Sequence, residues 1–267
     1  MLPTVKMVNT PPQQQLVSVS TNHHALAMLL VLFVLHILTL RNATNVESFH
    51  ALNQLGSYIP DWLLLSITDI GEGLTAGALM LICLIYRPHW LFKVLAASAL
   101  CMISVYCFKT YFDAPRPPAL VDVSHIVGRA EYERSFPSGH TTTAFAFAGV
   151  VWLMAKNWTT KCLILTLAFM VAFSRIAVGA HWPEDVAFGA ILGWLCAYIG
   201  CTRVPLATLS IKRLYQIILV IAVGVSAEEI LEIGQESISL MLFNRYVLIT
   251  VLLSLAVYSY RKIVLQR

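Results

Sequence analysis

The stretch SFPSGHTTTAFAFAGVVWLM, residues 135–154, joins a short polar turn to a long apolar run. Pro137, Ser138 and Gly139 are typical of a helix start, where a serine often acts as the N-cap. The unpaired N–H groups of a helix start also favour an anion. The stretch therefore predicts an apolar helix whose start is either an ordinary cap or part of an anion site.

The composition of the whole chain is that of a membrane protein. Of its 267 residues, 58% are hydrophobic and only 12% are charged, and the mean hydropathy is +0.74. Soluble domains carry about a quarter of charged residues. A membrane helix needs roughly 20 residues, so the chain is long enough for several. We expect an integral membrane protein, and we expect no nucleic-acid partner.

The apolar runs predict an all-α, polytopic membrane helix bundle. Six runs form its core: Ala25–Leu40, Trp62–Tyr86, Leu91–Phe112, Thr141–Ala155, Cys162–Val178 and Val186–Cys201. Two weaker candidates follow, Leu214–Ala227 and Leu240–Tyr260. The first of these runs into the acidic segment EEILEIGQE, so an interfacial or re-entrant helix is the alternative there. The predicted divisions are a polar tail (1–24), a membrane core (25–201) and a C-terminal extension (202–267) with one or two further helices.

The positions of the basic residues predict the orientation in the membrane. With a cytoplasmic amino terminus, eleven of the 18 lysines and arginines fall on or near the inner side. The C-terminus is then cytoplasmic too, and none of the 14 acidic residues lies in an inner loop. Most of the basic residues on the outer side lie between Lys109 and Arg134, with Arg175 as a separate one.

The first polar cluster is KTYFDAPRP, residues 109–117, at the outer end of the third predicted span. A lysine near a helix end often reaches to the interface without any further role, and that explanation suffices for Lys109 alone. Arg116 is different, because Pro115 and Pro117 stiffen the backbone on both sides of it. A guanidinium held at one point suits the oxygens of a phosphate group.

The second cluster is SRIAVGAHWPED, residues 174–185. Arg175 ends an otherwise apolar span, and such a buried cation calls for an anionic partner. His181 and Asp185 are four residues apart, and Pro183 suits the first turn of the next helix. If that turn begins near Trp182, the carboxylate can orient one imidazole nitrogen and leave the other free.

The third cluster is SFPSGH itself, in which His140 is the residue that an ordinary N-cap does not explain. A histidine at the edge of a membrane helix is titratable near neutral pH and suits proton transfer. His140, His181 and Asp185 also form a conceivable metal-ligand set. Three cations would surround that metal, however, and they favour an oxyanion. The clusters together describe a metal-free site for phosphoryl transfer.

These three clusters resemble the three-part signature of the type 2 phosphatidic acid phosphatase superfamily. The matching positions, in order, are Lys109-x6-Arg116-Pro117, Pro137-Ser138-Gly139-His140 and Ser174-Arg175-x5-His181-x3-Asp185. The likeness covers roughly Trp62 to Cys201 and leaves both ends of the chain outside it. It implies a six-helix core and requires no metal or other cofactor.

The resemblance also implies a role for each signature residue. His181 would attack phosphorus to give a phosphohistidine, with Asp185 orienting it. His140 would protonate the leaving oxygen and then activate water. The phosphoryl oxygens would be bound by five residues: Lys109, Arg116, Ser138, Gly139 and Arg175.

Asp69 and Glu72, in the second predicted span, are further candidates. They are three residues apart, so they would share one face of a continuous helix. Carboxylates within a span are functional candidates by default. They would support the site, contact the substrate head group, or neutralise the basic cluster and bond a neighbouring helix.

The leading functional expectation is a phosphatase of lipid phosphates or pyrophosphates at the outer face of a bacterial inner membrane. Undecaprenyl pyrophosphate, phosphatidylglycerol phosphate and lipid A phosphates are the substrate classes that the resemblance implies, and the motifs do not choose among them. One alternative is a lipid phosphotransferase that uses the same residues. Another is a lipid-binding or transport protein without catalysis.

Overall fold

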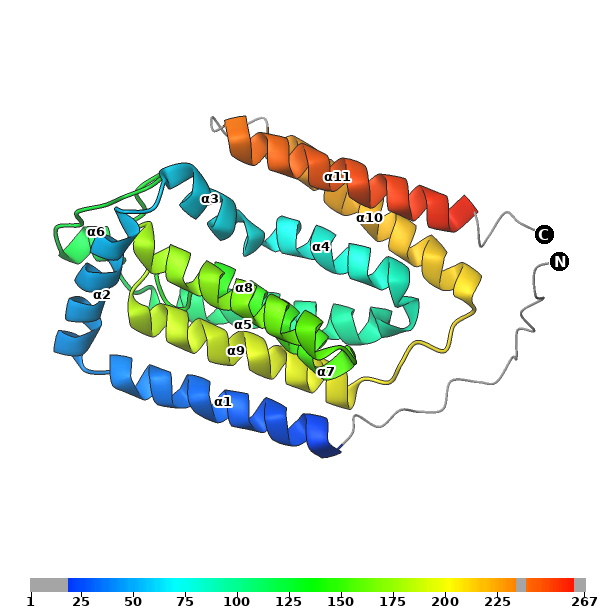
Figure 1. The fold of residues 1–267 in the computed structure, drawn as a ribbon, viewed down its shortest axis with the longest axis horizontal. Helices are drawn as coiled ribbons and strands as arrows, with labels where there is room; N and C mark the ends of the chain where they lie inside the picture. Colours follow the sequence, from blue (N-terminus) through cyan, green and yellow to red (C-terminus); the bar gives the residue numbers. More distant parts are fainter. Residues whose placement is uncertain (1–18, 234–238, 262–267) are drawn as a thin grey trace.

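A computed structural model describes residues 19–233 and 239–261 of the chain and shows an all-α bundle (Figure 1). Most of the predicted polar tail, residues 1–24, lies outside the described residues. The first half contains α1 (Val19–Thr39), α2 (Asn42–Gly56), α3 (Asp61–Ile70), α4 (Gly73–Tyr86), the 3-10 turn η1 (Pro88–Trp90) and α5 (Leu91–Phe112). The second half contains α6 (Pro117–Leu120), α7 (Gly139–Met154), α8 (Trp158–Ala177), α9 (Pro183–Arg203), α10 (Ile211–Ile233) and α11 (Ser239–Tyr260).

Several of these helices are long and apolar enough to cross a membrane. Among the described residues, Pro88–Leu120, Trp158–Ala177 and Pro183–Arg203 meet this description by length and composition, and two bent helix pairs would raise the number from 3 to 5. The predicted all-α membrane bundle is therefore confirmed. Each of the six predicted core runs corresponds to a helix or, in one case, to a pair of helices.

The predicted span Trp62–Tyr86 was wrong in one respect, because it is broken in two. Its halves α3 and α4 meet at an angle of 60°. Glu72 causes the restart: its Oε2 accepts hydrogen bonds from the N–H groups of Leu74 (2.7 Å) and Thr75 (3.0 Å) and so caps α4. The expected shared helix face of Asp69 and Glu72 does not exist, because Glu72 lies in the break.

A second bend separates α1 from α2, at an angle of 102°. Helix α2 lies across one end of the bundle, beside α6 (Figure 1). Its buried Asn53 explains the position: the side-chain amide donates to the carbonyls of His125 (2.7 Å) and Ala177 (3.0 Å). Helix α2 was not among the predicted elements, because its apolar content is too low for a span.

Helix α7 is the centre of the bundle and packs against α4, α5, α8 and α9. The approach of α9 is particularly close. A Cβ atom at Gly193 would lie 2.1 Å from the carbonyl oxygen of Thr142, so only glycine fits there. Small residues allow membrane helices to pack at such short distances. This contact holds the first turn of α7 against the middle of α9.

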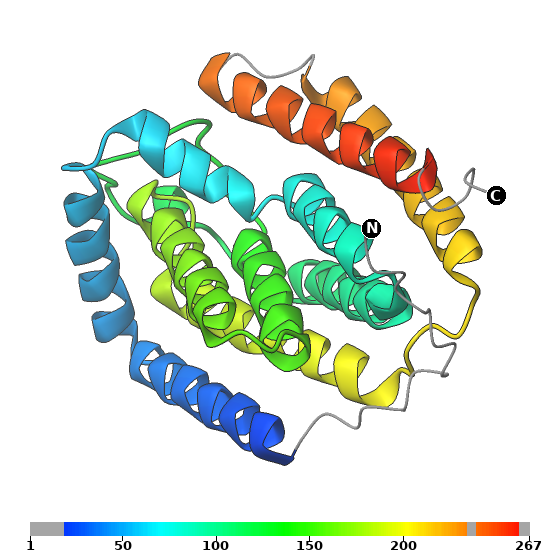
Figure 2. The same cartoon turned by 45° about the vertical axis from the view of Figure 1, so that its right-hand side comes forward.

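The C-terminal helices α10 and α11 lie side by side on the outer face of α3 and α4 (Figure 2). Leu214, Ile218 and Ala222 of α10 are buried in this packing. The predicted run Leu214–Ala227 is part of a helix of 23 residues, longer than the sequence suggested.

Candidate active site

The three polar clusters of the sequence meet at one end of the bundle. Backbone hydrogen bonds tie the α5–α7 connection to itself, from Arg116 N to Tyr132 O (2.9 Å) and from Ser135 N to Ala114 O (2.8 Å). A further bond runs from Ser138 N to Asp185 O (3.1 Å) and joins the start of α7 to the start of α9. The predicted convergence of the clusters is therefore confirmed.

His181 and Asp185 form a buried pair. The Nδ1 atom of His181 lies 3.4 Å from Oδ2 of Asp185, and both residues are only 1% exposed. The same carboxylate oxygen accepts a hydrogen bond from Ser135 Oγ (2.5 Å) and one from Trp182 N (2.9 Å). Three polar groups thus fix the carboxylate, and the carboxylate orients the imidazole. The predicted pairing, with α9 beginning after Trp182, is confirmed.

The other nitrogen of His181 faces cations. Arg116 Nη1 lies 3.5 Å from Nε2 of His181. Burial and the charges of Arg116 and Arg175 hold the pKa of His181 well below its ordinary value of 6.5. The imidazole is therefore neutral at pH 7, and a neutral imidazole with Nδ1 directed at a carboxylate is the form that can act as a nucleophile through Nε2.

The backbone around it holds Arg116 in place. Its Nε donates to Glu133 O (2.8 Å), and its Nη1 donates to Ala180 O (3.3 Å). Its Nη2 lies 2.6 Å from Oε2 of Glu131, whose side chain is 55% exposed, whereas that of Arg116 is 8% exposed. An ion pair with a solvent-exposed partner is weakened by the surrounding water. Glu131 therefore occupies one edge of the guanidinium without a strong hold on it.

Arg175 and Lys109 complete the ring of cations. The Nε atom of Arg175 is buried and has no hydrogen-bond partner in the part of the chain that the structure describes. A buried guanidinium N–H without a partner is rare and costly. Lys109 Nζ donates to Arg134 O (2.5 Å), which brings its charge to the same loop. The expected anionic partner of Arg175 is thus not a described side chain, and an anionic substrate would satisfy it.

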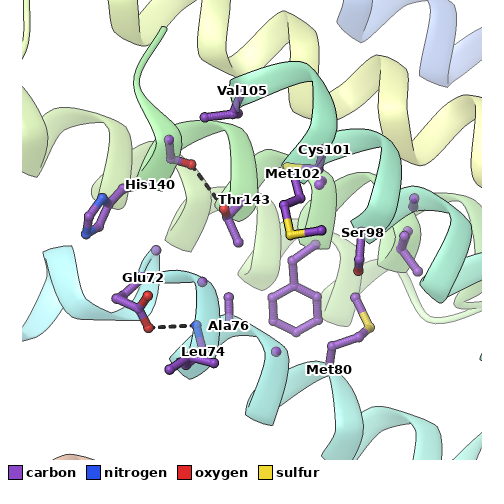
Figure 3. Close-up of a pocket in the computed structure, with 18 of the residues that line it drawn as sticks. Glu72, Leu74, Ala76, Met80, Ser98, Cys101, Met102, Val105, His140 and Thr143 are labelled. Atoms are coloured by element: carbon purple, nitrogen blue, oxygen red, sulfur yellow. Dashed lines mark hydrogen bonds between the residues drawn. The ribbon is translucent and has the colours of Figure 1, made fainter. Parts of the chain in front are cut away.

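The first turn of α7 is both a cap and a wall of the site. Ser138 is the N-cap, with its Oγ 3.5 Å from Thr141 N, so the ordinary role predicted for it is confirmed. Gly139 and His140 follow and line a cavity of about 640 Å³ between α4, α5 and α7. Figure 3 shows His140 and Glu72 at one end of this cavity and Met80 at the other. Lys109 also lines it.

Asp69 and Glu72 have different surroundings. Asp69 is buried and pairs with Arg245 of α11, with Oδ1 at 2.6 Å from Nη2 and 3.0 Å from Nε. Glu72 caps α4 and faces the cavity (Figure 3). Of the roles expected for them, Asp69 bonds a neighbouring helix, whereas Glu72 lines the cavity.

The donor atoms around His181 suit an anion better than a metal ion. Arg116 and Arg175 are positive, and no group of three or more His, Cys, Asp or Glu side chains within residues 19–233 and 239–261 is arranged to hold a metal. Cations and helix N–H groups are the ligands that phosphate oxygens prefer.

Two comparisons place the chain in a family. The family model described as the PAP2 superfamily matches residues 90–209. The crystal structure of LpxE from Aquifex aeolicus is similar with a TM-score of 0.53 and 30% sequence identity, and the match covers 58% of this chain and 93% of that one. The chain belongs to the PAP2 superfamily. It is an integral membrane protein of that all-helical fold.

Curated relatives of this PAP2 protein include two from Bacillus. The "Bacitracin transport permease protein BcrC" of Bacillus licheniformis is 48% identical over 67 residues, which are 25% of this chain. That match spans only 32% of the relative's length, or about a third. The "Undecaprenyl-diphosphatase BcrC" of Bacillus subtilis (strain 168) is 28% identical over 58% of this chain and 81% of the relative.

Three residues that were not among the predicted candidates bond the predicted ones. Ser135 bonds the carboxylate of Asp185, Glu131 pairs with Arg116, and Arg245 pairs with Asp69. Ser135 is the first residue of the stretch SFPSGH, so its place beside the other candidates could have indicated a role in the site. The other two pairs join residues that are 15 and 176 positions apart, and nothing local in the sequence points to them.

Proposed function

We propose that this protein is a metal-independent phosphatase of membrane lipid phosphates or pyrophosphates. The observation that carries the proposal is the arrangement around His181: a neutral, oriented imidazole that faces three cations, beside an apolar cavity that ends at His140. The curated relatives support the same class, because one of them is named an undecaprenyl-diphosphatase and another a lipid A 1-phosphatase.

The reaction has two steps in which His181 gains and then loses the phosphoryl group. In the first, Nε2 of His181 forms a bond to phosphorus while the bond from phosphorus to the lipid oxygen breaks, and His140 gives its proton to that oxygen. In the second, His140 takes a proton from water, whose oxygen attacks phosphorus and releases inorganic phosphate. Arg116, Arg175 and Lys109 stabilise the charge on the phosphoryl oxygens, together with the Ser138–Gly139 backbone.

The cavity gives the lipid chain a place next to the phosphate. Most of its lining is apolar and comes from Ala76, Met80, Val94, Ala97, Phe147 and Val150, on three helices. Its polar end holds His140, Lys109 and Glu72 (Figure 3). A single-chain or prenyl phosphate would lay its hydrocarbon in the apolar part and present its phosphate to His181. This arrangement favours a lipid over a soluble phosphate ester.

The orientation is a further part of the proposal. The distribution of basic residues supports cytoplasmic termini and an active site at the outer face of a bacterial inner membrane. A phosphate-release assay of the purified protein tests the function. Undecaprenyl pyrophosphate, phosphatidylglycerol phosphate and a lipid A phosphate, each in EDTA, form the panel. Activity that requires an added metal would contradict the mechanism, and transfer of phosphate to an added lipid acceptor would favour a phosphotransferase.

Blocking the cavity should impair long-chain substrates selectively. A Cβ at Gly77 of α4 meets no atom within 4 Å, and Gly77 lines the cavity, so the side chain of Gly77→Leu can extend into it. We expect KM for a long-chain lipid phosphate to rise about 10-fold, since one buried side chain is worth roughly 1.5–3 kcal/mol. A short-chain analogue should be unaffected.

A matched control exists in α10. Gly224 also has open space around its Cβ position, and it lies outside the cavity. Gly224→Leu should leave KM unchanged for both substrates. Equal effects of the two substitutions, or equal effects on long and short chains, would show that the hydrocarbon binds elsewhere.

The pH dependence should follow the lowered pKa of His181. The imidazole must be unprotonated to attack, and its pKa lies well below 6.5, so protonation of His181 should not limit kcat/KM until the pH is well below that value. Arg116 is the strongest of the neighbouring charges that lower this pKa. Arg116→Gln should therefore move the acid limb of kcat/KM to higher pH.

The control for this measurement is Arg129→Gln, which removes an exposed arginine from the same loop. Its acid limb should coincide with that of the wild type. An acid limb of Arg116→Gln that stays in place, or moves to lower pH, would mean that a group other than His181 sets it.

A further inference from the structure

The C-terminal helix α11 contributes a buried cation next to the site. Arg245 and Asp69 have side-chain exposures of only 4% and 6%, and two hydrogen bonds of 2.6 and 3.0 Å link Nη2 and Nε to the same carboxylate oxygen. Breaking a buried pair by removing one partner is strongly unfavourable, because the other charge stays behind. Both residues lie outside residues 90–209, the part that matches the family model.

Asp69 belongs to the last turn of α3, and this turn touches both halves of the site. One residue before it, Thr68 Oγ1 lies 2.7 Å from Ser174 Oγ, next to Arg175 in α8. Two residues after it, Gly71 packs against the first turn of α7. A Cβ at Gly71 would lie 2.9 Å from the carbonyl oxygen of His140 and 3.1 Å from its Cβ. The turn is therefore in direct contact with the backbone of His140.

The break after Asp69 connects two helix ends that are held separately. The 60° bend between α3 and α4 leaves Gly71 and Glu72 outside both helices, so their position depends on what holds the ends of α3 and α4. Glu72 holds the start of α4 through the N–H groups of Leu74 and Thr75. Two bonds hold the end of α3, the one from Thr68 to Ser174 and the ion pair of Asp69 with Arg245.

We propose that Arg245 is a positioning residue for His140, acting through Asp69 and the Gly71–Glu72 break. The proposal rests on the proposed function, in which His140 protonates the leaving oxygen. Helix α11 holds Asp69, Asp69 fixes the break, and the close packing of Gly71 fixes the first turn of α7 that carries His140. The C-terminal helices thus cover α3 and α4 and, through Arg245 of α11, also help to position His140.

The dependence of rate on the leaving group separates this role from a structural one. A poor leaving group needs its proton from His140, whereas a good one departs without it. Two substrates with the same tail provide the test: a 4-alkylphenyl phosphate and its nitro-substituted analogue, whose phenol is more acidic. Because kcat/KM covers the first phosphoryl transfer, it is the quantity to compare. His140→Asn serves as the reference and should lose far more on the first substrate than on the second.

Arg245→Gln should show the same pattern to a smaller degree. We expect kcat/KM to fall about 10-fold on the 4-alkylphenyl phosphate and less than about 3-fold on the nitro analogue, since general acid catalysis contributes roughly 10²–10⁴-fold in total. Arg245→Lys keeps the charge, so its loss of kcat/KM on the 4-alkylphenyl phosphate should be smaller than that of Arg245→Gln. The control Arg213→Gln, an exposed arginine at the start of α10, should match the wild type on both substrates.

Equal losses of Arg245→Gln on the two substrates, or no loss, would overturn the proposal. If Arg245→Gln does not yield folded protein by size-exclusion chromatography and thermal unfolding, the double variant Asp69→Asn/Arg245→Gln is compared in the same way, because it removes both charges together. A wild type that hydrolyses neither substrate nor any lipid of the panel would instead refute the proposed function. If His140→Asn shows the expected larger loss of kcat/KM on the 4-alkylphenyl phosphate while Arg245→Gln matches the wild type, only the positioning role is refuted.

Discussion

Replacing His181 with alanine should abolish phosphate release from every lipid in the panel. In the proposed mechanism the neutral imidazole forms the bond to phosphorus, and it is held between Nη1 of Arg116 (3.5 Å) and Oδ2 of Asp185 (3.4 Å). We expect a loss of at least about 10⁴-fold in kcat, in line with the removal of a catalytic nucleophile elsewhere. The covalent adduct should disappear as well, measured as alkali-stable radioactive phosphate on protein quenched during turnover.

The control for this variant is His50→Ala, which removes an exposed histidine of α2. It should retain both the activity and the adduct. Full or partial activity of His181→Ala in EDTA, with an adduct still present, would assign the nucleophile to another residue and refute the mechanism. Loss of the adduct with activity retained would point to direct attack by water.

Replacing Asp185 with asparagine should have the second largest effect. The amide can keep one oxygen near Ser135 Oγ and Trp182 N, so the local fold is preserved. It removes the negative charge that orients His181 and compensates the charge on the imidazole once phosphorus is bound. The corresponding change in a Ser-His-Asp triad lowers kcat about 10⁴-fold. We therefore expect a loss of about 10³–10⁴-fold in kcat/KM with an unchanged melting temperature.

Glu184→Gln provides the matched control, because it neutralises the adjacent carboxylate in the same helical turn. The backbone N–H of Glu184 donates to Asn45 Oδ1 at 3.1 Å, and the substitution keeps this bond. Glu184→Gln should keep activity within a few-fold of the wild type. If Asp185→Asn were equally active, His181 would not depend on the carboxylate for its orientation.

Much of the candidate site could be predicted because its signals are local. Arg116 lies between two prolines, Ser138 precedes an apolar run, and His181 lies four residues before Asp185. Each of these patterns restricts the backbone or the side chain within one or two helical turns. The topology, which followed from hydropathy, then placed all of them on one membrane face.

The helix break within the second predicted span could not be predicted in the same way. The run Trp62–Tyr86 is apolar enough for one span despite Asp69 and Glu72, and hydropathy does not distinguish a straight helix from a bent one. Glu72 was read as a residue on a helix face, although its carboxylate caps a new helix. The bend depends on contacts with α7 and α8, which come from residues about 70 and 100 positions later in the chain.

The sequence by itself determined that this is an all-helical membrane protein and which side chains we propose for the chemistry, because apolar length, proline positions and short spacings act locally. Only the tertiary structure decided how those side chains are held. The Asp69–Arg245 pair, the bond from Ser135 to Asp185 and the cavity between α4, α5 and α7 all join segments distant in sequence. Such contacts depend on how whole helices pack, and no local pattern specifies that.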